Sequence, residues 1–252
     1  NRQALIDAIS NGVHVCIASG RAFDTLPEDI ISVPGIEYAI TSNGAAIYRI
    51  AGKECLKSYL LTPSSVKTIL NLTANDTVTY EAFIKGQAFA STEYIRHPEK
   101  YGATEHSLAY VKKTRILKDD IKDFILEHCH ELDSLDIVVG NEELKKNIMD
   151  RIRNATDEVY MTSSISQLLE ISYKDAGKKS GVKFLTEYLG LSRENVAAFG
   201  DADNDTDMIE YAGTGIAMEN AAPHLKQIAD HITLHHDKDG VAYAFRNILN
   251  IC

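Results

Sequence analysis

Short apolar runs alternate with amphipathic segments over much of the chain. The first pair is a helical pattern over residues 2–10, with Leu5 and Ile9 on one face, followed by the apolar run 13–18. From residue 167 onward, strand-like runs and helical patterns alternate in the same way. Nearly continuous apolar runs suit parallel strands that helices cover on both faces. The alternation therefore predicts an α/β fold with a doubly wound, Rossmann-like parallel sheet.

The expected elements of this sheet come from both ends of the chain. Its strands are predicted at residues 13–18, 36–40, 168–172, 195–199, 215–218 and 231–234. Its helices are predicted at residues 2–10, 181–189, 203–211, 222–229 and 241–249. Residues 45–59 alternate more loosely and suggest a hairpin.

The middle of the chain has a different pattern. Strands are expected within residues 77–90 and at 135–139 and 159–161, and helices at 116–129 and 142–154. Mixed elements of this kind indicate a separate α+β module, and residues 60–63 can form a hinge in front of it. We therefore predict a core domain built from residues 1–61 and 163–252, with a second domain, residues 62–162, inserted between them.

The amino-acid composition argues against some classes of function. Lys plus Arg number 26 and Asp plus Glu number 36, which gives a net charge of −10. General binding to nucleic acid or to acidic membranes needs a basic footprint, so this charge argues against both. No apolar run approaches the roughly 18 residues of a membrane-spanning helix. The four cysteines lie far apart and form no Cys-x-x-Cys pair, so we expect reduced thiols in a cytoplasmic protein.

Polar residues gather where the predicted core strands end. Ser19-Gly20-Arg21 follows the first strand, and Asn43-Gly44 follows the second. An acidic cluster at residues 200–205 follows the apolar run 196–199, and Lys178 stands just before the helix expected near Gly181. Ligands bind at the carboxyl ends of strands in open parallel sheets, so these groups are candidate site residues.

The acidic cluster contains Asp201, Asp203 and Asp205. Carboxylates this close repel one another unless a cation or a lysine compensates, and Mg²⁺ prefers oxygen ligands of this kind. A second interpretation is a solvated helix N-terminus, where Asp is favourable. A calcium loop is a third, but Thr206 and Ala212 occupy the positions where such a loop needs Gly and Glu.

The other candidates can each serve phosphate chemistry or a purely structural purpose. Ser19 can donate its hydroxyl to a phosphate oxygen or hold a turn. Lys178 can neutralise phosphate charge or lie on the surface. Asn43 can be a turn former, and Arg21 can be a surface residue or part of an ion pair. Each of these candidates follows a strand or begins a helix, so the combination is a stronger signal than any one of them.

In combination, these segments resemble the haloacid dehalogenase superfamily, and more narrowly its Cof-type sugar-phosphatase-like members. Ile17-Ala18-Ser19-Gly20-Arg21 is similar to the second motif of that family, and Thr41-Ser42-Asn43-Gly44-Ala45 to its Asn-Gly segment. Glu170-Ile171 followed by Lys178 resembles the third motif. Phe199-Gly200-Asp201-Ala202-Asp203-Asn204-Asp205, with Met208 after it, resembles the fourth. Closing segments at 215–221 and 239–241 extend the resemblance over nearly the whole chain.

The resemblance implies an enzyme that hydrolyses small phosphate monoesters, such as sugar phosphates, through an aspartyl-phosphate intermediate with Mg²⁺. The inserted module would then be an α/β cap that selects the leaving group. On this basis Ser19 hydrogen-bonds a phosphoryl oxygen and Lys178 balances the charge of the nucleophile and the phosphate. Asp201 ligates Mg²⁺, Asp205 supports the metal or Lys178, and Asn204 positions the metal shell or the phosphate. The further residues implied in the substrate pocket are Gly20, Arg21, Asn43 and Gly44.

The sequence departs from the family at its first motif. Asp-x-Asp-Gly-Thr, which supplies the nucleophile and the general acid–base at the end of the family's central first strand, does not occur in the printed chain. We therefore expect a shortened copy of a longer phosphatase, without its first core strand. The alternative is a catalytically silent fragment or a module that binds phosphate ligands. A dinucleotide-binding domain is disfavoured, because Gly213 and Gly215 are followed by Met218 where Gly or Ala is needed.

Overall fold

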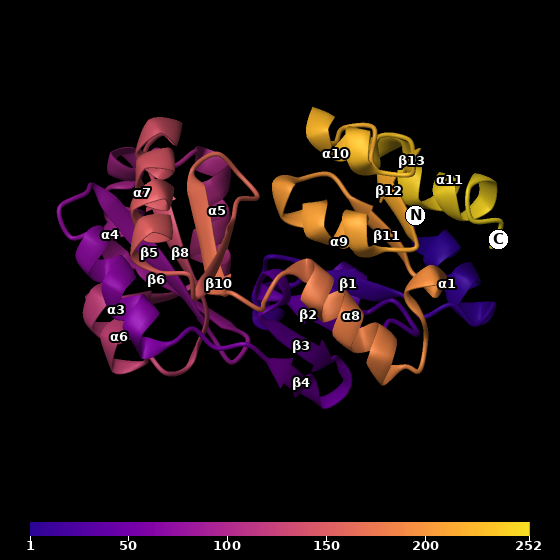
Figure 1. Ribbon diagram of the computed structural model, residues 1–252, viewed down its shortest axis with the longest axis horizontal. Coiled ribbons are helices and arrows are strands. Elements are labelled where there is room, and N and C mark those ends of the chain that lie inside the picture. Colours follow the sequence, from indigo (N-terminus) through magenta and orange to yellow (C-terminus); the bar gives the residue numbers. More distant parts are fainter. Residues whose placement is uncertain (252) are drawn as a thin grey trace.

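The chain folds into two lobes that lie side by side (Figure 1). The computed structural model describes residues 1–251, except for the side chain of His106. Strand pairing assigns residues 1–61 and 174–251 to one lobe, here called the core lobe, and residues 62–173 to the other, the cap lobe. Within the described residues, no helix is both long and apolar enough to cross a bilayer.

The core lobe holds two short sheets with helices packed around them. One sheet has the order β1-β2-β3-β4, with β1 and β2 parallel, and the other has the order β11-β12-β13, all parallel. Its strands are β1 (Cys16–Ala18), β2 (Tyr38–Thr41), β3 (Ala46–Arg49), β4 (Glu54–Ser58), β11 (Ala197–Gly200), β12 (Thr214–Ala217) and β13 (His231–Ile232). Its helices are α1 (Arg2–Ser10), α2 (Glu28–Ile31), α8 (Lys178–Tyr188), α9 (Thr206–Tyr211), α10 (Pro223–Ile228) and α11 (Gly240–Asn247). The α/β class is as predicted, and β3 and β4 form the expected hairpin.

The parallel strands do not join into one sheet, which differs from the prediction. β1 is an edge of the first sheet and β11 is an edge of the second. A cavity of about 660 Å³ separates them, lined mostly by apolar side chains of both sheets and of their helices, including Val15, Val182, Leu185 and Phe199. The two edges therefore face an apolar cavity rather than each other.

The cap lobe has one six-stranded sheet of order β7-β6-β5-β8-β10-β9. All neighbouring strands are antiparallel except β6 and β7. The strands are β5 (Val78–Ile84), β6 (Gln87–Ser91), β7 (Ile116–Lys118), β8 (Leu132–Val139), β9 (Val159–Thr162) and β10 (Leu168–Tyr173). The helices are α3 (Pro63–Leu72), α4 (Thr92–Arg96), α5 (Glu105–Thr114), α6 (Ile121–Glu127) and α7 (Glu142–Ala155).

The two faces of the cap sheet differ in chemistry. Alternate residues of β5, β8 and β10, such as Tyr80, Ile137 and Leu169, pack in one apolar cluster with side chains of α3, α6 and α7. The residues between them point to the opposite face, because successive side chains of a strand alternate. On that face the three strands carry buried polar groups, among them Glu81 and Asp136.

Two expectations from the sequence need correction. β10 belongs to the cap sheet, paired with β8 and β9, and not to the core, so the cap extends beyond residue 162. Its short apolar run precedes a helix and therefore has the local pattern of a core β-α unit. Residues 116–129 are also not one helix. Residues 116–118 form β7, and α6 begins after Asp120, whose carboxylate accepts the Asp123 N–H at 3.0 Å.

Candidate active site

Ser19 and Asn43 meet at the carboxyl ends of β1 and β2. The Ser19 N–H donates to the Ile40 carbonyl at 2.9 Å, which extends the parallel ladder by one residue, and the Asn43 N–H donates to the Ser19 carbonyl at 3.1 Å. The Ser19 hydroxyl oxygen accepts the Arg21 N–H at 3.1 Å, so its own hydrogen remains available for a ligand. Sequence spacing alone therefore located two residues that the fold brings into contact.

The turn at residues 42–44 fixes the start of α8. Asn43 has φ 52° and Gly44 has φ 86°, both left-handed, a conformation that favours Asn and Gly. A Cβ on Gly44 would lie 1.9 Å from the carbonyl oxygen of Gly177, and the Gly177 N–H donates to the Asn43 carbonyl at 2.9 Å. The backbone at residue 44 approaches the backbone at residue 177 so closely that residue 44 must be glycine. This contact also fixes the position of Lys178, the first residue of α8.

Lys178 and Asp205 form a buried ion pair. Lys178 Nζ lies 2.5 Å from Asp205 Oδ1, and both side chains are largely excluded from solvent. The second oxygen, Asp205 Oδ2, accepts the N–H groups of Asp201 and Ala202 at 2.9 and 3.1 Å. The Asp205 carboxylate thus holds both the lysine ammonium and the loop that follows β11.

Asn204 connects this loop to the turn after β2. Its Nδ2 donates to Asn43 Oδ1 at 3.0 Å, and both side chains are buried. Asn43 therefore contacts three separate segments, through Ser19, Gly177 and Asn204. The residues expected at the strand ends form one hydrogen-bonded group at one rim of the core lobe.

Asp201 is the exposed carboxylate of the group. Its Oδ2 accepts Asn220 Nδ2 at 2.8 Å, whereas Asp203 lies 3.3 Å from His224 Nε2 on the surface. Mg²⁺ in proteins commonly takes one or two carboxylates together with water and phosphate oxygens. Asp201 fits such a ligand, while both oxygens of Asp205 already hold Lys178 and the loop.

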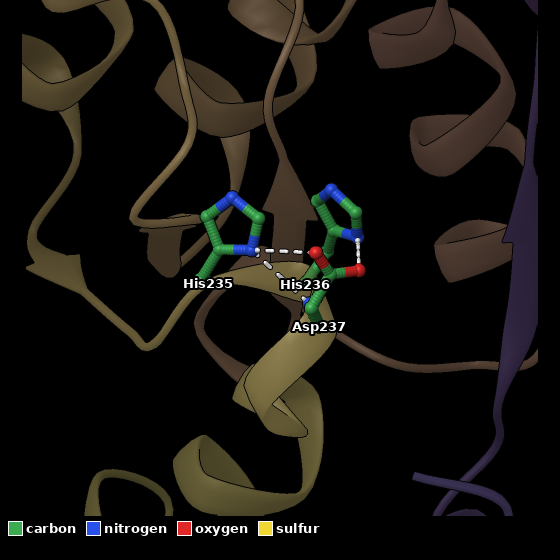
Figure 2. Close-up of side chains that lie close together, drawn as sticks. All are labelled: His235, His236 and Asp237. Atoms are coloured by element: carbon green, nitrogen blue, oxygen red, sulfur yellow. Dashed lines mark hydrogen bonds and ion pairs between the residues drawn. The ribbon is translucent and has the colours of Figure 1, made fainter.

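A second cluster of potential ligands lies near Asn220. His235 and His236 place their Nδ1 atoms 3.4 and 2.8 Å from the Asp237 carboxylate on an exposed turn (Figure 2). The His236 N–H donates to Asn220 Oδ1 at 3.2 Å. Imidazole nitrogen suits transition metals better than Mg²⁺, so this turn is chemically distinct from the Asp201 site.

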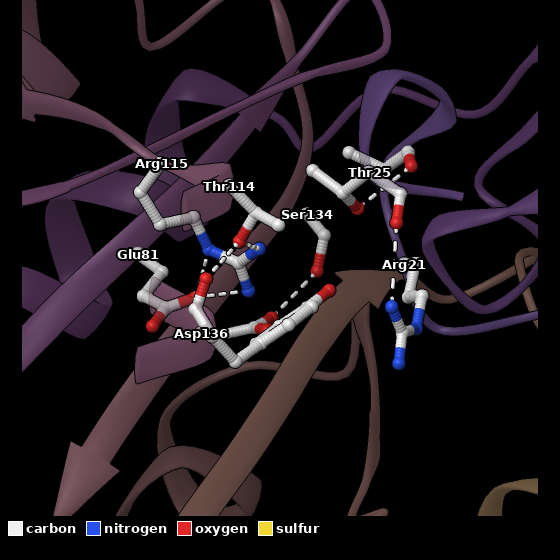
Figure 3. A network of polar contacts seen from close by, with 9 residues as sticks. Arg21, Thr25, Glu81, Thr114, Arg115, Ser134 and Asp136 are labelled. Atoms are coloured by element: carbon white, nitrogen blue, oxygen red, sulfur yellow. Dashed lines mark hydrogen bonds and ion pairs between the residues drawn. The ribbon is translucent and has the colours of Figure 1, made fainter. Parts of the chain in front are cut away.

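Arg21 contacts both lobes, and Figure 3 shows its side chain with Thr25. Its guanidinium donates to the Thr25 carbonyl at 3.3 Å and lies 4.6 Å from the ring centroid of Tyr110 in α5. Gly20 remains at the rim, where a Cβ would lie 2.8 Å from Glu170 Oε1 and 3.1 Å from Asn43 Oδ1. Arg21 thus contacts α5 of the cap, and Gly20 and Asn43 lie beside Glu170 of the cap strand β10.

Sequence analysis placed Glu170 in the segment that resembles the third motif and Asn220 in a closing segment, but it assigned neither of them a role in the site. Asn220 follows β12, so its position after a core strand was a usable signal. Glu170 lies inside an apolar strand pattern, and only the fold places it next to Gly20. Burial is the main cause that raises the pKa of Glu170, and Asn43 and Lys178 act in the opposite direction.

Comparison with known proteins identifies the family. The sequence pattern of the haloacid dehalogenase-like hydrolases matches residues 1–245. A Bacillus subtilis relative, 5-amino-6-(5-phospho-D-ribitylamino)uracil phosphatase YcsE, is 30% identical over 248 residues, which cover 98% of this chain and 86% of the relative. Phosphatase YwpJ of the same organism is 29% identical, with 99% and 92% covered.

The fold agrees with this family. The solved structure of the HAD subclass IIB sugar phosphatase BT4131 superposes with a TM-score of 0.84 at 20% identity, over 99% of this chain and 90% of that one. A haloacid dehalogenase-like hydrolase from B. subtilis superposes with a TM-score of 0.81 at 24% identity, over 98% and 91% of the two chains. The chain belongs to the haloacid dehalogenase-like hydrolases, as a phosphatase-type, Cof-like member of that family.

Proposed function

We propose that the strand-end group is the phosphate- and metal-binding part of a Mg²⁺-dependent phosphatase. It would hydrolyse small phosphate monoesters, sugar phosphates or similar compounds, through an aspartyl-phosphate intermediate. The observation that carries the proposal is the connection through Asn43, which brings together residues from the ends of β1, β2 and β11 and the start of α8. The free cysteines Cys16, Cys55 and Cys129 support the cytoplasmic location expected from the sequence.

The proposed roles follow from charge and geometry. Phosphoryl transfer depends mainly on positioning the phosphate and on neutralising its charge. The Ser19 hydroxyl donates to one phosphoryl oxygen, and the Lys178 ammonium, held by Asp205, supplies positive charge beside it. Asp201 would hold Mg²⁺, which would supply Lewis-acid stabilisation of the phosphate charge. Asn204 and Asn43 keep the two loops at a fixed separation.

The nucleophile has a defined place in this proposal. The cavity between β1 and β11 is lined at one end by Ala18 and Phe199, which directly precede Ser19 and Gly200. A parallel strand seated there would end beside Ser19 and Asp201, where an aspartate must lie to attack the phosphorus. Because the printed sequence lacks Asp-x-Asp-Gly-Thr, a second candidate is a module that binds phosphate ligands without turnover.

A phosphate-release assay separates the two candidates. The chain as printed, with Mg²⁺ and a sugar phosphate, should release no phosphate, whereas a variant extended by an N-terminal strand that ends in Asp-x-Asp-Gly-Thr should be active. In the extended protein, Lys178→Ala should lower turnover by about 10²-fold or more, as for lost transition-state donors. Mg²⁺-dependent release by the unextended chain, abolished in Asp201→Ala, would show that the nucleophile lies within it.

A further inference from the structure

Three buried carboxylates stand side by side on the cap sheet. Glu81 of β5 is opposite Asp136 of β8, and Asp136 is opposite Glu170 of β10. Residues in direct register on antiparallel strands have their Cβ atoms about 5 Å apart. The three side chains, here called the carboxylate row, are 3%, 1% and 3% exposed. Like charges placed directly opposite each other destabilise a sheet, so positive charge or protons must balance the row.

The carboxylate row faces the core lobe. It lies on the face opposite the apolar cluster, and on that face Phe83, two residues from Glu81, packs against Ala22 of the core lobe. At the other end, Glu170 Oε1 lies 2.8 Å from the Cβ position of Gly20. The Glu170 end of the row therefore lies beside Gly20, and Glu81 lies at the other end, where Figure 3 shows Glu81 and Asp136 near Arg115 and Thr114.

The protein supplies donors to each of these carboxylates but leaves one oxygen without a partner. Arg115 binds Glu81, with Nε and Nη2 at 2.7 and 2.6 Å from its Oε2, and the Ser134 hydroxyl donates to Asp136 at 2.9 Å. Burial raises the pKa of Glu170 and hydrogen bonds from Asn43 and Ser164 lower it, but its Oε2 atom is buried and has no hydrogen-bond partner in the described part of the chain. A buried acceptor left unpaired costs about 1–3 kcal/mol, so this oxygen marks a place for a donor from a ligand.

The charge balance points to a cationic donor. Among the described residues, Arg115 alone forms an ion pair with a carboxylate of the row, whereas Lys178, which lowers the pKa of Glu170, is paired with Asp205. Burial, together with the charges of Glu170 and Glu81, raises the pKa of Asp136. Protonation of Asp136 is one way to relieve this repulsion. An ammonium is another, because it supplies three donors and a positive charge to carboxylates that stay charged.

We infer that Glu170 and Asp136 form the subsite for the leaving group and that they bind a protonated amine on the phosphorylated substrate. The inference rests on the proposed function in one respect, that the phosphate lies at Ser19 and Lys178. The row begins beside Gly20, next to that phosphate position, so an amine on a small sugar or amino alcohol can reach it. Glu170 and Asp136 are specificity-determining residues in this scheme.

The test compares two ligands that differ in one group. Glucosamine 6-phosphate carries an ammonium where glucose 6-phosphate carries a hydroxyl. Isothermal titration of the chain with Mg²⁺ should give at least about tenfold tighter binding of the amine, since charge-assisted hydrogen bonds are the strong ones. Glu170→Gln and Asp136→Asn should each bring the affinity ratio close to one. Glu127→Gln, at an exposed carboxylate of α6 across the sheet, should leave the ratio unchanged.

Each outcome has a distinct meaning. Equal affinity for the two sugars in the unaltered chain, or a preference that survives both substitutions, would overturn the amine subsite. Inorganic phosphate, titrated into the unaltered chain, tests the proposed function separately. If inorganic phosphate binds and the amine preference is absent, the subsite fails alone. If the amine preference depends on Glu170 but inorganic phosphate does not bind, the proposed phosphate position fails alone. If no ligand binds, both fail.

Discussion

Gly44→Ala is the sharpest perturbation of the turn that organises the site. Alanine there must adopt φ 86°, which costs about 1–2 kcal/mol for a residue with a Cβ. Its Cβ would also lie 1.9 Å from the Gly177 carbonyl oxygen, a backbone atom that cannot rotate away. Forced overpacking typically costs a further 1–3 kcal/mol or so. We expect the free energy of unfolding to fall by about 2–5 kcal/mol.

Gly52→Ala is the matched control. Gly52 has φ 75°, and a Cβ there meets no atom within 4 Å, so only the conformational cost of about 1–2 kcal/mol applies. Urea unfolding followed by circular dichroism measures both losses. Titration with inorganic phosphate should show weaker binding for Gly44→Ala alone, because relief of the clash displaces the start of α8 and Lys178. Equal losses of stability in the two variants, with phosphate binding intact, would refute the reasoning.

Two further substitutions test buried charges. Lys178→Ala leaves the Asp205 carboxylate buried and unpaired, so the free energy of unfolding measured in urea should fall by about 3–5 kcal/mol. Lys179→Ala, at the exposed neighbour, should lower it by about 0.5 kcal/mol or less. Equal losses in the two variants would contradict a buried ion pair. Burial raises the pKa of Asp133 to about 6 in the folded protein, whereas an Asp side chain in the unfolded chain has a pKa near 3.9. The folded state therefore binds the Asp133 proton more tightly. The free energy of unfolding falls as the pH rises from about 3.9 to about 6. The Asp133→Asn variant cannot lose this proton, so its free energy of unfolding relative to the parent should rise by up to about 3 kcal/mol between pH 4 and pH 7. A stability difference between variant and parent that stays constant with pH would contradict this prediction.

Local pattern predicted much of the core. The helix expected at residues 2–10 is α1, and the polar residues placed at strand ends meet at one rim, because parallel strands bring their carboxyl ends together. The segment 168–172 was correctly expected to be a strand but was assigned to the wrong sheet. Periodicity reports which faces of a strand are buried, and it carries no information about which strand becomes its partner.

The carboxylate row likewise could not be predicted from local sequence patterns. Glu81, Asp136 and Glu170 are separated by more than 30 residues from one another, and only Glu170 lies in a segment that resembles a family motif. Their meeting depends on the register of β5, β8 and β10, which is set by pairing across the sheet. Arg21 was expected in the pocket, yet its contact with Tyr110 depends on how the two lobes pack.

The account depends on a single site that binds both phosphate and a divalent cation. Phosphorus NMR of inorganic phosphate, with Mn²⁺ in place of Mg²⁺, measures whether the two ligands lie together, since Mn²⁺ shares the preference for oxygen ligands. We predict strong paramagnetic broadening of the bound phosphate signal, reduced in Asp201→Ala through loss of the metal and in Ser19→Ala through loss of the phosphate. Phosphate that binds the protein without being broadened by bound Mn²⁺, or broadening that both variants leave unchanged, would contradict the account.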